Sequence, residues 1–562
     1  MPRKLVRRQS LHELPDLPPL RQRLFSNRGV ESADELDYSL KKLHSPNLLK
    51  DIDSAVGILM QTIAANERIL IVGDFDADGA TSCALLVSGL RALGASHVDY
   101  LVPDRFRFGY GLTSEIVEVA REKSPDLIVT VDNGISSLDG VATARALGYK
   151  VIITDHHLPG RELPQANAIV NPNQPGCEFP SKSLAGVGVA FYLLTALRSR
   201  MRDEGVEVDA NLADWLDLVA LGTIADVVPM DHNNRILVAE GIRRIRGGRA
   251  RPGLYALLQI SGLESQRVNS RDLAFSVGPR LNAAGRLENI SLGIECLLAN
   301  SDEGLQLAQT LQSLNEERKI LEREMKRGAE QQALNLSAIR IDDQVGITLF
   351  NRDWHQGVVG IVASRIKERF HRPTIVFAPG ENDELKGSAR SIQGLHIRDA
   401  LDSIATQNEG LISKFGGHAM AAGLTIDRSN LERFRDLFDQ EARRWLTDED
   451  LEQVVVTDGE LDEISLTIAW DVSEMAPWGQ AFPEPVFDGE FEVLDQRIVG
   501  ERHLKLLVRP ISGQEAYDAI FFNRDRLLER RHTCLAYRLD INRYRGSESV
   551  QLIVEAADIV KA

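Results

Sequence analysis

The stretch RILIVGDFDADGATSCALLVSGLRALG (residues 68–94) predicts a strand, an acidic turn and a helix in succession. Residues 68–72 form a compact β-branched run that is typical of a buried strand, and residues 80–94 have the pattern of a helix. The turn between them carries three carboxylates at alternate positions, which are Asp74, Asp76 and Asp78. We therefore expect the acidic cluster to follow the end of a strand.

A calcium loop of the EF-hand type is the first alternative for this cluster, because D-x-D-x-D-G also begins such a loop. Counted from Asp74, the twelfth position of the loop requires a bidentate Glu, and Leu85 stands there. A buried strand before the cluster also disagrees with the helix that precedes an EF-hand loop. The sequence therefore argues against a calcium loop.

The alternation of strand and helix continues along the chain. Further strands are predicted at 96–103, 124–134 and 148–160, with helical stretches at 113–123 and 137–148 between them. A βαβ series of this kind predicts a parallel sheet. The fold class of the first half is therefore α/β.

Acidic and imidazole side chains are predicted at one edge of this sheet. They follow the third and fourth strands and a later buried helix, and they are Asp132, Asp155, His156, His157 and Asp226. Ligands of open α/β sheets bind outside the carboxyl ends of the strands, so we expect these residues to converge there. One Asp at a strand end is commonly a helix cap. So many anions together would repel one another without a cation, and the sequence therefore predicts a metal cluster.

The ligand chemistry predicts which metal is bound. Carboxylates mixed with imidazole, without thiolate, favour Mn²⁺ or Mg²⁺ over Zn²⁺ or Co²⁺. Five or six ligands exceed the need of one ion, so two divalent ions about 3.5–4 Å apart are expected. Two-metal sites of this kind hydrolyse phosphate esters.

Length and composition set outer limits on the protein. A chain of 562 residues with 43% hydrophobic content predicts three or four domains. No apolar run approaches the roughly 18–20 residues of a membrane span, and the N-terminus lacks the apolar middle of a secretory signal. The four cysteines lie far apart without C-x-x-C, which suggests neither a disulfide framework nor a thiolate zinc site. A cytoplasmic protein without a membrane partner is expected.

The net charge of −17 argues against a protein that contacts nucleic acid over its whole surface. A negative net charge is compatible with a local basic track that contacts nucleic acid. The segment GIRRIRGGRARPG (241–253) holds five arginines among glycines, which suits phosphate contact. A solvated loop is the alternative for this segment.

The second half of the chain predicts three further parts. Residues 301–336 have apolar positions at helical spacing and predict a long exposed helix. Beyond it, a strand–helix–strand unit precedes glycine-rich turns at 385–391 and 413–426, which allow backbone N–H groups to approach phosphate. Short strands from about 455 to 562 predict a small barrel, with a structural lid as the competing interpretation.

The motifs DFDADG, VDNG, TDHH and IADVVP resemble, in order and spacing, the four motifs of the DHH phosphoesterase superfamily. Over nearly its whole length the chain is similar to the superfamily's bacterial single-strand-specific 5′→3′ exonucleases. The resemblance implies a parallel-sheet DHH domain and a smaller α/β substrate-binding domain, joined by a long helix, with a C-terminal β-barrel of the OB-fold that binds single-stranded DNA. The implied boundaries are 1–50 for an N-terminal extension, 51–300 for the DHH domain, 301–338 for the helix, 339–445 for the small domain and 455–562 for the OB-fold.

The resemblance also implies roles for the acidic and imidazole residues. Asp76 and Asp78 match the paired ligands of the D-x-D element, and Asp132 matches the carboxylate that bridges both ions. His156 matches the imidazole ligand, and Asp226 matches the last carboxylate ligand.

The roles of three neighbouring groups follow from the same resemblance. Asp155 is expected to orient His156, as metal-bound histidines usually require, and His157 is expected to face the scissile phosphate. Adjacent side chains on an extended segment point in opposite directions, so both histidines are not expected on one ion. Many superfamily members have a histidine where Val72 stands, and Asp74 is expected to supply the missing ligand, with a cap or an outer orienting role as the alternative.

Substrate contacts are implied in the second half of the chain. Arg280, Ser388 and Arg390 match the residues that hold a terminal 5′-phosphate, and the glycine–glycine–histidine signature appears as Gly416, Gly417 and His418. Tyr110 is a candidate for base stacking, with core or turn packing as the alternative.

The function implied is a metal-dependent exonuclease that degrades single-stranded DNA from 5′ ends to mononucleotides in recombination and repair. A monomer that acts with a single-strand-binding protein and a helicase is expected. Two alternatives remain open, a DHH phosphodiesterase of short oligonucleotides or cyclic dinucleotides and a non-catalytic DHH replication scaffold.

Overall fold

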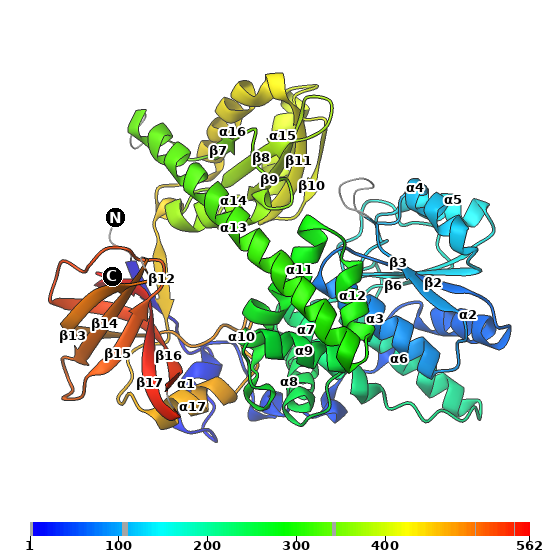
Figure 1. Ribbon diagram of the computed structural model, residues 1–562, viewed down its shortest axis with the longest axis horizontal. Helices are drawn as coiled ribbons and strands as arrows, with labels where there is room; N and C mark the ends of the chain where they lie inside the picture. The colour runs from blue at the N-terminus through cyan, green and yellow to red at the C-terminus, as the bar shows by residue number, and fades with distance from the viewer. Residues whose placement is uncertain (1–3, 104–110, 340–343, 501, 545, 562) are drawn as a thin grey trace. The chain divides into compact units, whose positions relative to one another are not determined.

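The computed structural model describes residues 4–103, 111–339, 344–500, 502–544 and 546–561 (Figure 1). Tyr110 lies outside these residues, so its predicted role stays a prediction. The chain divides into two compact units. The small unit comprises Met1–Val6, Glu316–Val456 and Asp558–Ala562, and the large unit comprises Arg7–Asn315 and Thr457–Ala557.

A five-stranded parallel sheet of order β3-β2-β4-β5-β6 forms the centre of the large unit. Its strands are β2 (Ile69–Gly73), β3 (Val98–Leu101), β4 (Leu127–Val131), β5 (Lys150–Thr154) and β6 (Ala168–Val170). Ile69 and Ile71 belong to one hydrophobic cluster, and Leu70 and Val72 belong to another. The sheet therefore has apolar side chains buried on both faces, as the continuous β-branched runs predict.

Helices cover both faces of this sheet (Figure 1). One face packs against α2 (Ile52–Ala64), α3 (Ala77–Ala92) and α6 (Gly186–Asp203). The other packs against α4 (Ser114–Ala120) and α5 (Leu138–Ala146). The predicted parallel α/β fold is confirmed.

Further helices follow in the large unit, and all of them except α10 contribute side chains to the first cluster. They are α7 (Leu216–Ala225), α8 (His232–Arg246), α9 (Pro252–Ile260), α10 (Ser270–Asp272), the π-helix η7 (Leu273–Val277), α11 (Gly278–Leu287) and α12 (Ser291–Leu298). The single helix expected up to residue 230 is instead a 3₁₀ turn, η5 (Leu212–Trp215), followed by α7. Helix α11 packs against α3 and α7, so it borders both.

The long predicted helix is α13 (Ser301–Ile339), which begins in the large unit and continues into the small one. The small unit has a five-stranded sheet of order β10-β11-β9-β8-β7. Its elements are β7 (Ile347–Phe350), α14 (Val359–Phe370), β8 (Thr374–Pro379), β9 (Glu384–Arg390), α15 (Ile397–Gln407), β10 (Lys414–Gly417), β11 (Ala421–Asp427) and α16 (Leu431–Trp445). Only β7 and β8 pair in parallel within this sheet, so the unit is mixed α/β.

The C-terminal strands close into a barrel of order β13-β14-β15-β17-β16 within the large unit. They are β13 (Phe487–Val499), β14 (His503–Pro510), β15 (Tyr517–Phe521), β16 (His532–Tyr544) and β17 (Ser547–Ala557), and α1 (Pro19–Ser26) and α17 (Leu466–Glu474) lie before them in the chain. Phe487, Phe491 and Tyr537 fill the barrel core. The predicted small barrel is confirmed.

A separate three-stranded sheet joins the two ends of the chain. Strand β1 (Lys4–Arg7) lies between β12 (Val454–Thr457) and β18 (Val560–Lys561). Across the described ranges, none of the helices has the length and apolar character needed to cross a membrane.

Candidate metal centre

The acidic turn after β2 is shaped by two sets of backbone donors. The Asp76 carboxylate caps α3, because its Oδ1 accepts hydrogen bonds from the N–H groups of Asp78 and Gly79, both at 3.0 Å. The Asp78 carboxylate accepts from the N–H groups of Gly186 at 2.6 Å and Val187 at 2.9 Å, at the start of α6. The cap of α3 is therefore Asp76 and not Asp74, for which a cap was one alternative.

The backbone turns sharply after β4. Asp132 has a φ of 60°, a conformation that few residues other than glycine adopt, and it is 1% exposed. Its N–H donates to the carbonyl of Thr154 at 3.1 Å. The side chain of Asn133 donates to the carbonyls of Val72 at 3.1 Å and Val131 at 2.8 Å. Neighbouring strand ends thus hold the turn that presents the Asp132 carboxylate.

Asp155 is the centre of the hydrogen bonds that follow β5. Its carboxylate accepts from the backbone N–H groups of Ile135 at 2.9 Å, His156 at 2.7 Å and His157 at 3.1 Å. It also lies 2.7 Å from Nδ1 of the His157 ring. Asp155 thus contacts His156 through the backbone N–H and His157 through the ring. Its role in orienting the His156 ring stays a prediction.

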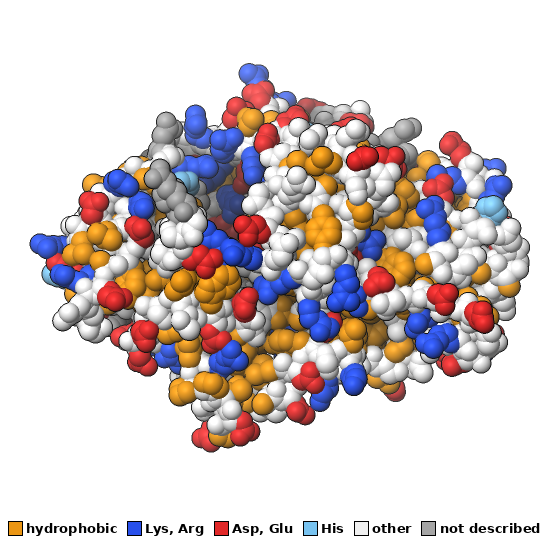
Figure 2. All heavy atoms as spheres, turned by 60° about the horizontal axis from the view of Figure 1, so that its bottom comes forward, with side chains coloured by type: hydrophobic (Ala, Val, Ile, Leu, Met, Phe, Trp, Pro, Cys, Tyr) orange, Lys and Arg blue, Asp and Glu red, His pale blue; other side chains and the backbone are white. Residues whose placement is uncertain are grey.

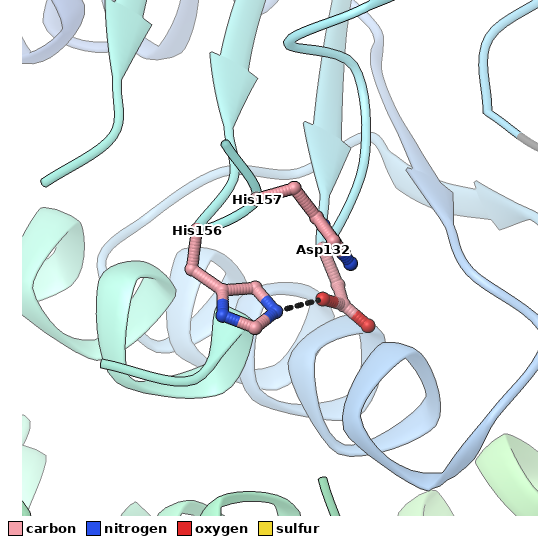
Figure 3. Close-up of side chains that lie close together, drawn as sticks. All are labelled: Asp132, His156 and His157. Atoms are coloured by element: carbon pink, nitrogen blue, oxygen red, sulfur yellow. Dashed lines mark ion pairs between the residues drawn. The ribbon is translucent and has the colours of Figure 1, made fainter. Parts of the chain in front are cut away.

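The His156 ring faces two carboxylates. Its Nε2 lies 3.1 Å from Oδ1 of Asp132 and 3.4 Å from Oδ2 of Asp226, which follows the end of α7. Figure 3 shows the ring directed toward the Asp132 carboxylate, with His157 beside it on the same loop. The ends of β4, β5 and α7 therefore meet at this ring.

All six predicted metal ligands are brought together. Ligand atoms within 4.8 Å of one another occur in three sets: Asp74 with Asp76 and Asp132, Asp78 with His156 and Asp226, and Asp132 with His156 and His157. The second histidine, expected to face the phosphate, thus lies in the same cluster. Asp132 and His156 each belong to two sets, so they occupy the middle of the arrangement.

Burial and mutual repulsion shift the protonation of these carboxylates. Burial and the charge of Asp76 raise the pKa of Asp78 to about 7. Burial and the charges of Asp78 and Asp76 raise the pKa of Asp132 well above its usual value. The pKa of Asp226 is raised by burial and by the same two neighbours. Divalent cations would favour the ionised forms of all three, so the donors fit hard metal ions such as Mn²⁺ and Mg²⁺.

In the pair formed by Asp155 and His157, the attraction between opposite charges outweighs the effect of burial on both pKa values. Burial disfavours a charged His157, but the hydrogen bond and charge of Asp155 outweigh burial and raise its pKa to about 9. Burial likewise disfavours ionised Asp155, but its bond to His157 lowers its pKa. The two side chains therefore form an ion pair inside the centre.

Two asparagines that sequence reasoning missed hold the histidine loop. Asn173 donates from Nδ2 to the carbonyl of His156 at 2.6 Å, and Asn171 donates from Nδ2 to the carbonyl of His157 at 2.9 Å. Both follow β6, a neighbouring strand of the same sheet. The run Asn-Pro-Asn after a short apolar segment was the available signal, since it too lies at a strand end.

The residues predicted to hold a 5′-phosphate occupy both units. Arg280 lies on α11 in the large unit, is 7% exposed, and donates from Nε to Gln312 at 2.7 Å. Ser388 and Arg390 lie on β9 in the small unit, with Nη1 of Arg390 3.0 Å from the Ser388 hydroxyl. Their shared role stays a prediction.

The glycine–glycine–histidine signature ends β10. Gly417 has a φ of 148°, and a Cβ there would lie 2.4 Å from the carbonyl of Ala421, so only glycine fits. The N–H of His418 donates to the same carbonyl at 2.8 Å. Gly416 pairs with Gly423 in β11. The signature therefore forms a tight turn between β10 and β11.

The arginine-rich segment 241–253 makes ion pairs within the protein. Arg251 pairs with buried Asp217 at 3.0 Å, and Arg244 pairs with Asp214 at 3.1 Å. Lys, Arg, Asp and Glu side chains are also intermixed on the face drawn in Figure 2. These pairs favour a structural role for the segment over a phosphate track.

Known protein families match three parts of the chain. The DHH family N-terminal domain matches residues 68–223, the DHHA1 domain matches 342–444, and the RecJ OB domain matches 457–556. A relative from Salmonella typhimurium, named single-stranded-DNA-specific exonuclease RecJ, is 52% identical over 98% of this chain and 98% of its own.

Two solved structures also resemble the chain. RecJ from Thermus thermophilus in complex with Mn²⁺ has a TM-score of 0.79 and 30% identity, and covers 98% of this chain and 80% of its own. The same protein in complex with Mg²⁺ has a TM-score of 0.74 and 29% identity, and covers 98% and 79%.

Proposed function

Because the chain belongs to the RecJ family of single-stranded-DNA-specific exonucleases, we propose that it removes mononucleotides from the 5′ end of single-stranded DNA. The observation that carries this proposal is the convergence of carboxylates and imidazoles at the carboxyl edge of the parallel sheet. The match to the RecJ OB domain over 457–556 favours long strands over the short-oligonucleotide alternative. A place in recombination and repair is consistent with the family.

Two divalent ions would be held by two sets of side chains that meet at Asp132. Asp74 and Asp76 form one set with Asp132, and Asp78, His156 and Asp226 form the other. Oδ1 of Asp132 lies 3.1 Å from Nε2 of His156, which supports a role for this carboxylate in both sets. When bound, the ions would supply an activated water and offset charge on the phosphoryl oxygens.

The protein's own groups would orient the substrate at this centre. Asp155 holds Nδ1 of His157 and thereby fixes the direction of its Nε2, which we assign to a non-bridging oxygen of the scissile phosphate. Asn171 and Asn173 hold the carbonyls of the histidine loop and keep both rings in place. The backbone N–H groups of Gly186 and Val187 hold the Asp78 carboxylate at a fixed position.

The 5′ polarity would come from a pocket for the terminal phosphate. We assign contacts with that phosphate to Arg280, Ser388 and Arg390, and a backbone contact to the Gly416–Gly417–His418 turn. A pinned end leaves only the terminal nucleotide at the metal centre, so hydrolysis would release mononucleotides. The guanidinium groups suit this role because they bind phosphate in a bidentate manner.

The domain division proposed with this function has five parts. It comprises an extension (1–50), a DHH catalytic domain (51–300), a connecting helix (301–338), a small substrate-binding domain (339–445) and an OB-fold for the strand (455–562). A monomer in the cytoplasm, supplied with single strands by a helicase and a single-strand-binding protein, completes the proposal. Light scattering tests the monomer, and co-purification tests the partners.

The deciding experiment is digestion of end-labelled single strands with Mn²⁺ or Mg²⁺. A 5′ label should be released as mononucleotide at once, whereas a 3′ label should remain in a strand that shortens steadily. Duplex DNA of the same sequence should resist. Release of the 3′ label first would refute the polarity, and no hydrolysis with either metal would refute the function.

A further inference from the structure

Three of the most exposed hydrophobic side chains belong to segments that supply or adjoin the metal ligands. Within the described residues, four large hydrophobic side chains are at least 61% exposed, namely Leu11, Leu158, Val227 and Phe275. Leu158 directly follows His157, and Val227 directly follows Asp226. Single exposed hydrophobics are ordinary, but several on segments that border one site are typical of a ligand-binding surface.

Phe275 is held outward by the helix that carries it. It lies in the middle of η7, where Leu273 and Val277 are fully buried while Phe275 is 76% exposed. Residues four positions apart share a helix face, so the two buried residues anchor one side and Phe275 points to the other. Single-turn π-helices of this kind occur often at functional sites.

The η7 segment lies next to the metal centre within the large unit. Gly278 follows η7, and a Cβ there would lie 3.2 Å from the Cβ of Ala225, the residue before Asp226. At the far end of α11, a Cβ on Gly285 would lie 1.9 Å from the carbonyl of Phe75, inside the acidic turn. Helix α11 therefore contacts two of the segments that supply metal ligands, and Phe275 projects from the turn before it.

Val227 adds a second unusual feature to this edge. Its φ is 61°, a left-handed conformation that is strained for a β-branched residue, and its side chain is 61% exposed. Strain of this kind is found at binding and catalytic sites, where the surrounding structure enforces it. An apolar side chain is thus held in solvent directly beside a ligand of the metal centre.

We propose that Phe275 stacks on a base of the single-stranded DNA substrate, and that Val227 and Leu158 make apolar contacts with the same strand. This inference rests on the proposed function. Cations and arginines bind the phosphates of a strand, so the base faces are the part that apolar side chains can contact. Aromatic stacking tolerates any base, as an exonuclease requires. In a duplex these faces are already stacked, so this apolar group would favour single strands.

The test measures KM on 5′-phosphorylated oligothymidylate for wild type, Phe275→Ala and Phe275→Tyr. Loss of one base–aromatic stack should raise KM about tenfold in Phe275→Ala, and Phe275→Tyr should stay within about twofold of wild type. Strands with a single abasic site, scanned along the first nucleotides, then locate the contact. At one position the difference between wild type and Phe275→Ala should disappear, because the base that stacks is gone.

Leu147→Ala is the matched control. Leu147 is an exposed hydrophobic residue that ends α5, which returns the chain to the opposite edge of the sheet, so its KM should equal that of wild type. A wild-type KM in Phe275→Ala would overturn the inference. If the KM of Phe275→Ala exceeds that of wild type by the same factor at every abasic position, the inference is also overturned, since that result indicates a structural role. If wild type itself leaves single strands intact, the proposed function fails instead.

Discussion

The metal centre and the arginine-rich segment 241–253 both contain many charged side chains. In the segment most of these charges are paired with opposite charges of the protein, whereas in the centre like charges lie close together. In the segment, each buried or half-buried charged side chain forms an ion pair, such as that between Arg251 and Asp217 at 3.0 Å. In the centre, carboxylates face one another, and burial with mutual repulsion raises the pKa of Asp132 and Asp226. Charge that is neutralised within the protein stabilises the fold, whereas charge of one sign that the fold concentrates requires a ligand of the other sign.

The largest expected effect is on activity at the centre. Asp132→Asn should lower kcat at least about 10³-fold, because several kcal/mol of transition-state stabilisation depend on the ions it would share. With chelator present, the same variant should melt no lower than wild type, since the substitution removes repulsion. Single-turnover hydrolysis measures the rate, thermal melting measures the stability, and Mn²⁺ titration calorimetry measures the number and affinity of the bound ions. A variant that binds two ions with wild-type affinity would contradict the assignment.

The arginine-rich segment should respond in the opposite way. Asp217→Ala leaves the half-buried Arg251 without its carboxylate and should cost about 3 kcal/mol of unfolding free energy. The activity of the molecules that remain folded should be unchanged. Denaturant unfolding and kcat measured well below the transition separate the two effects. Loss of DNA affinity with unchanged stability would instead restore the phosphate-track interpretation.

Added metal should stabilise variants of the arginine-rich segment as much as wild type, but variants of the metal centre less. Mn²⁺ at 100 times its Kd should stabilise the wild-type protein by about 2.7 kcal/mol for each ion bound. Asp217→Ala should gain the same amount, whereas Asp132→Asn should gain less. Melting with Mn²⁺ and with chelator gives the differences. An identical gain in all three proteins would place the metal elsewhere.

The smallest effect is expected at Asp155, where the centre contains a neutralised pair of its own. Asp155→Asn should lower kcat about 10–100-fold through misorientation of His157, as outer hydrogen-bonding partners at metal sites generally do. Mn²⁺ affinity should change little if His157 contacts phosphate. A loss of affinity as large as that of His156→Ala would show that His157 is a metal ligand.

Much of the fold and the centre could be predicted because the carboxyl ends of parallel strands meet at one edge. The β-branched runs identified β2, β4 and β5, and the residues that follow them came together for that reason. Helix α13 was predictable from its spacing alone. Local patterns were sufficient wherever the chain places its ligands directly after a buried strand.

The remaining contacts depend on tertiary packing that no local pattern encodes. The N–H groups that bind Asp78 come from α6, more than 100 positions later in the chain. Asp155 contacts the ring of His157 but only the backbone N–H of His156. Strand β6 has only three residues, too few for its composition to mark it as a strand. The register of such contacts emerges only when the elements pack.

The pairing of β1 with β18 has a consequence for synthesis of the protein. Lys4 pairs with Val560, so β1 gains this partner only after residues 560 and 561 have left the ribosome. At about 5–20 residues per second, translation of the chain takes roughly half a minute to two minutes. For most of that time neither edge of β1 has its backbone partner, because β12 also lies late in the chain.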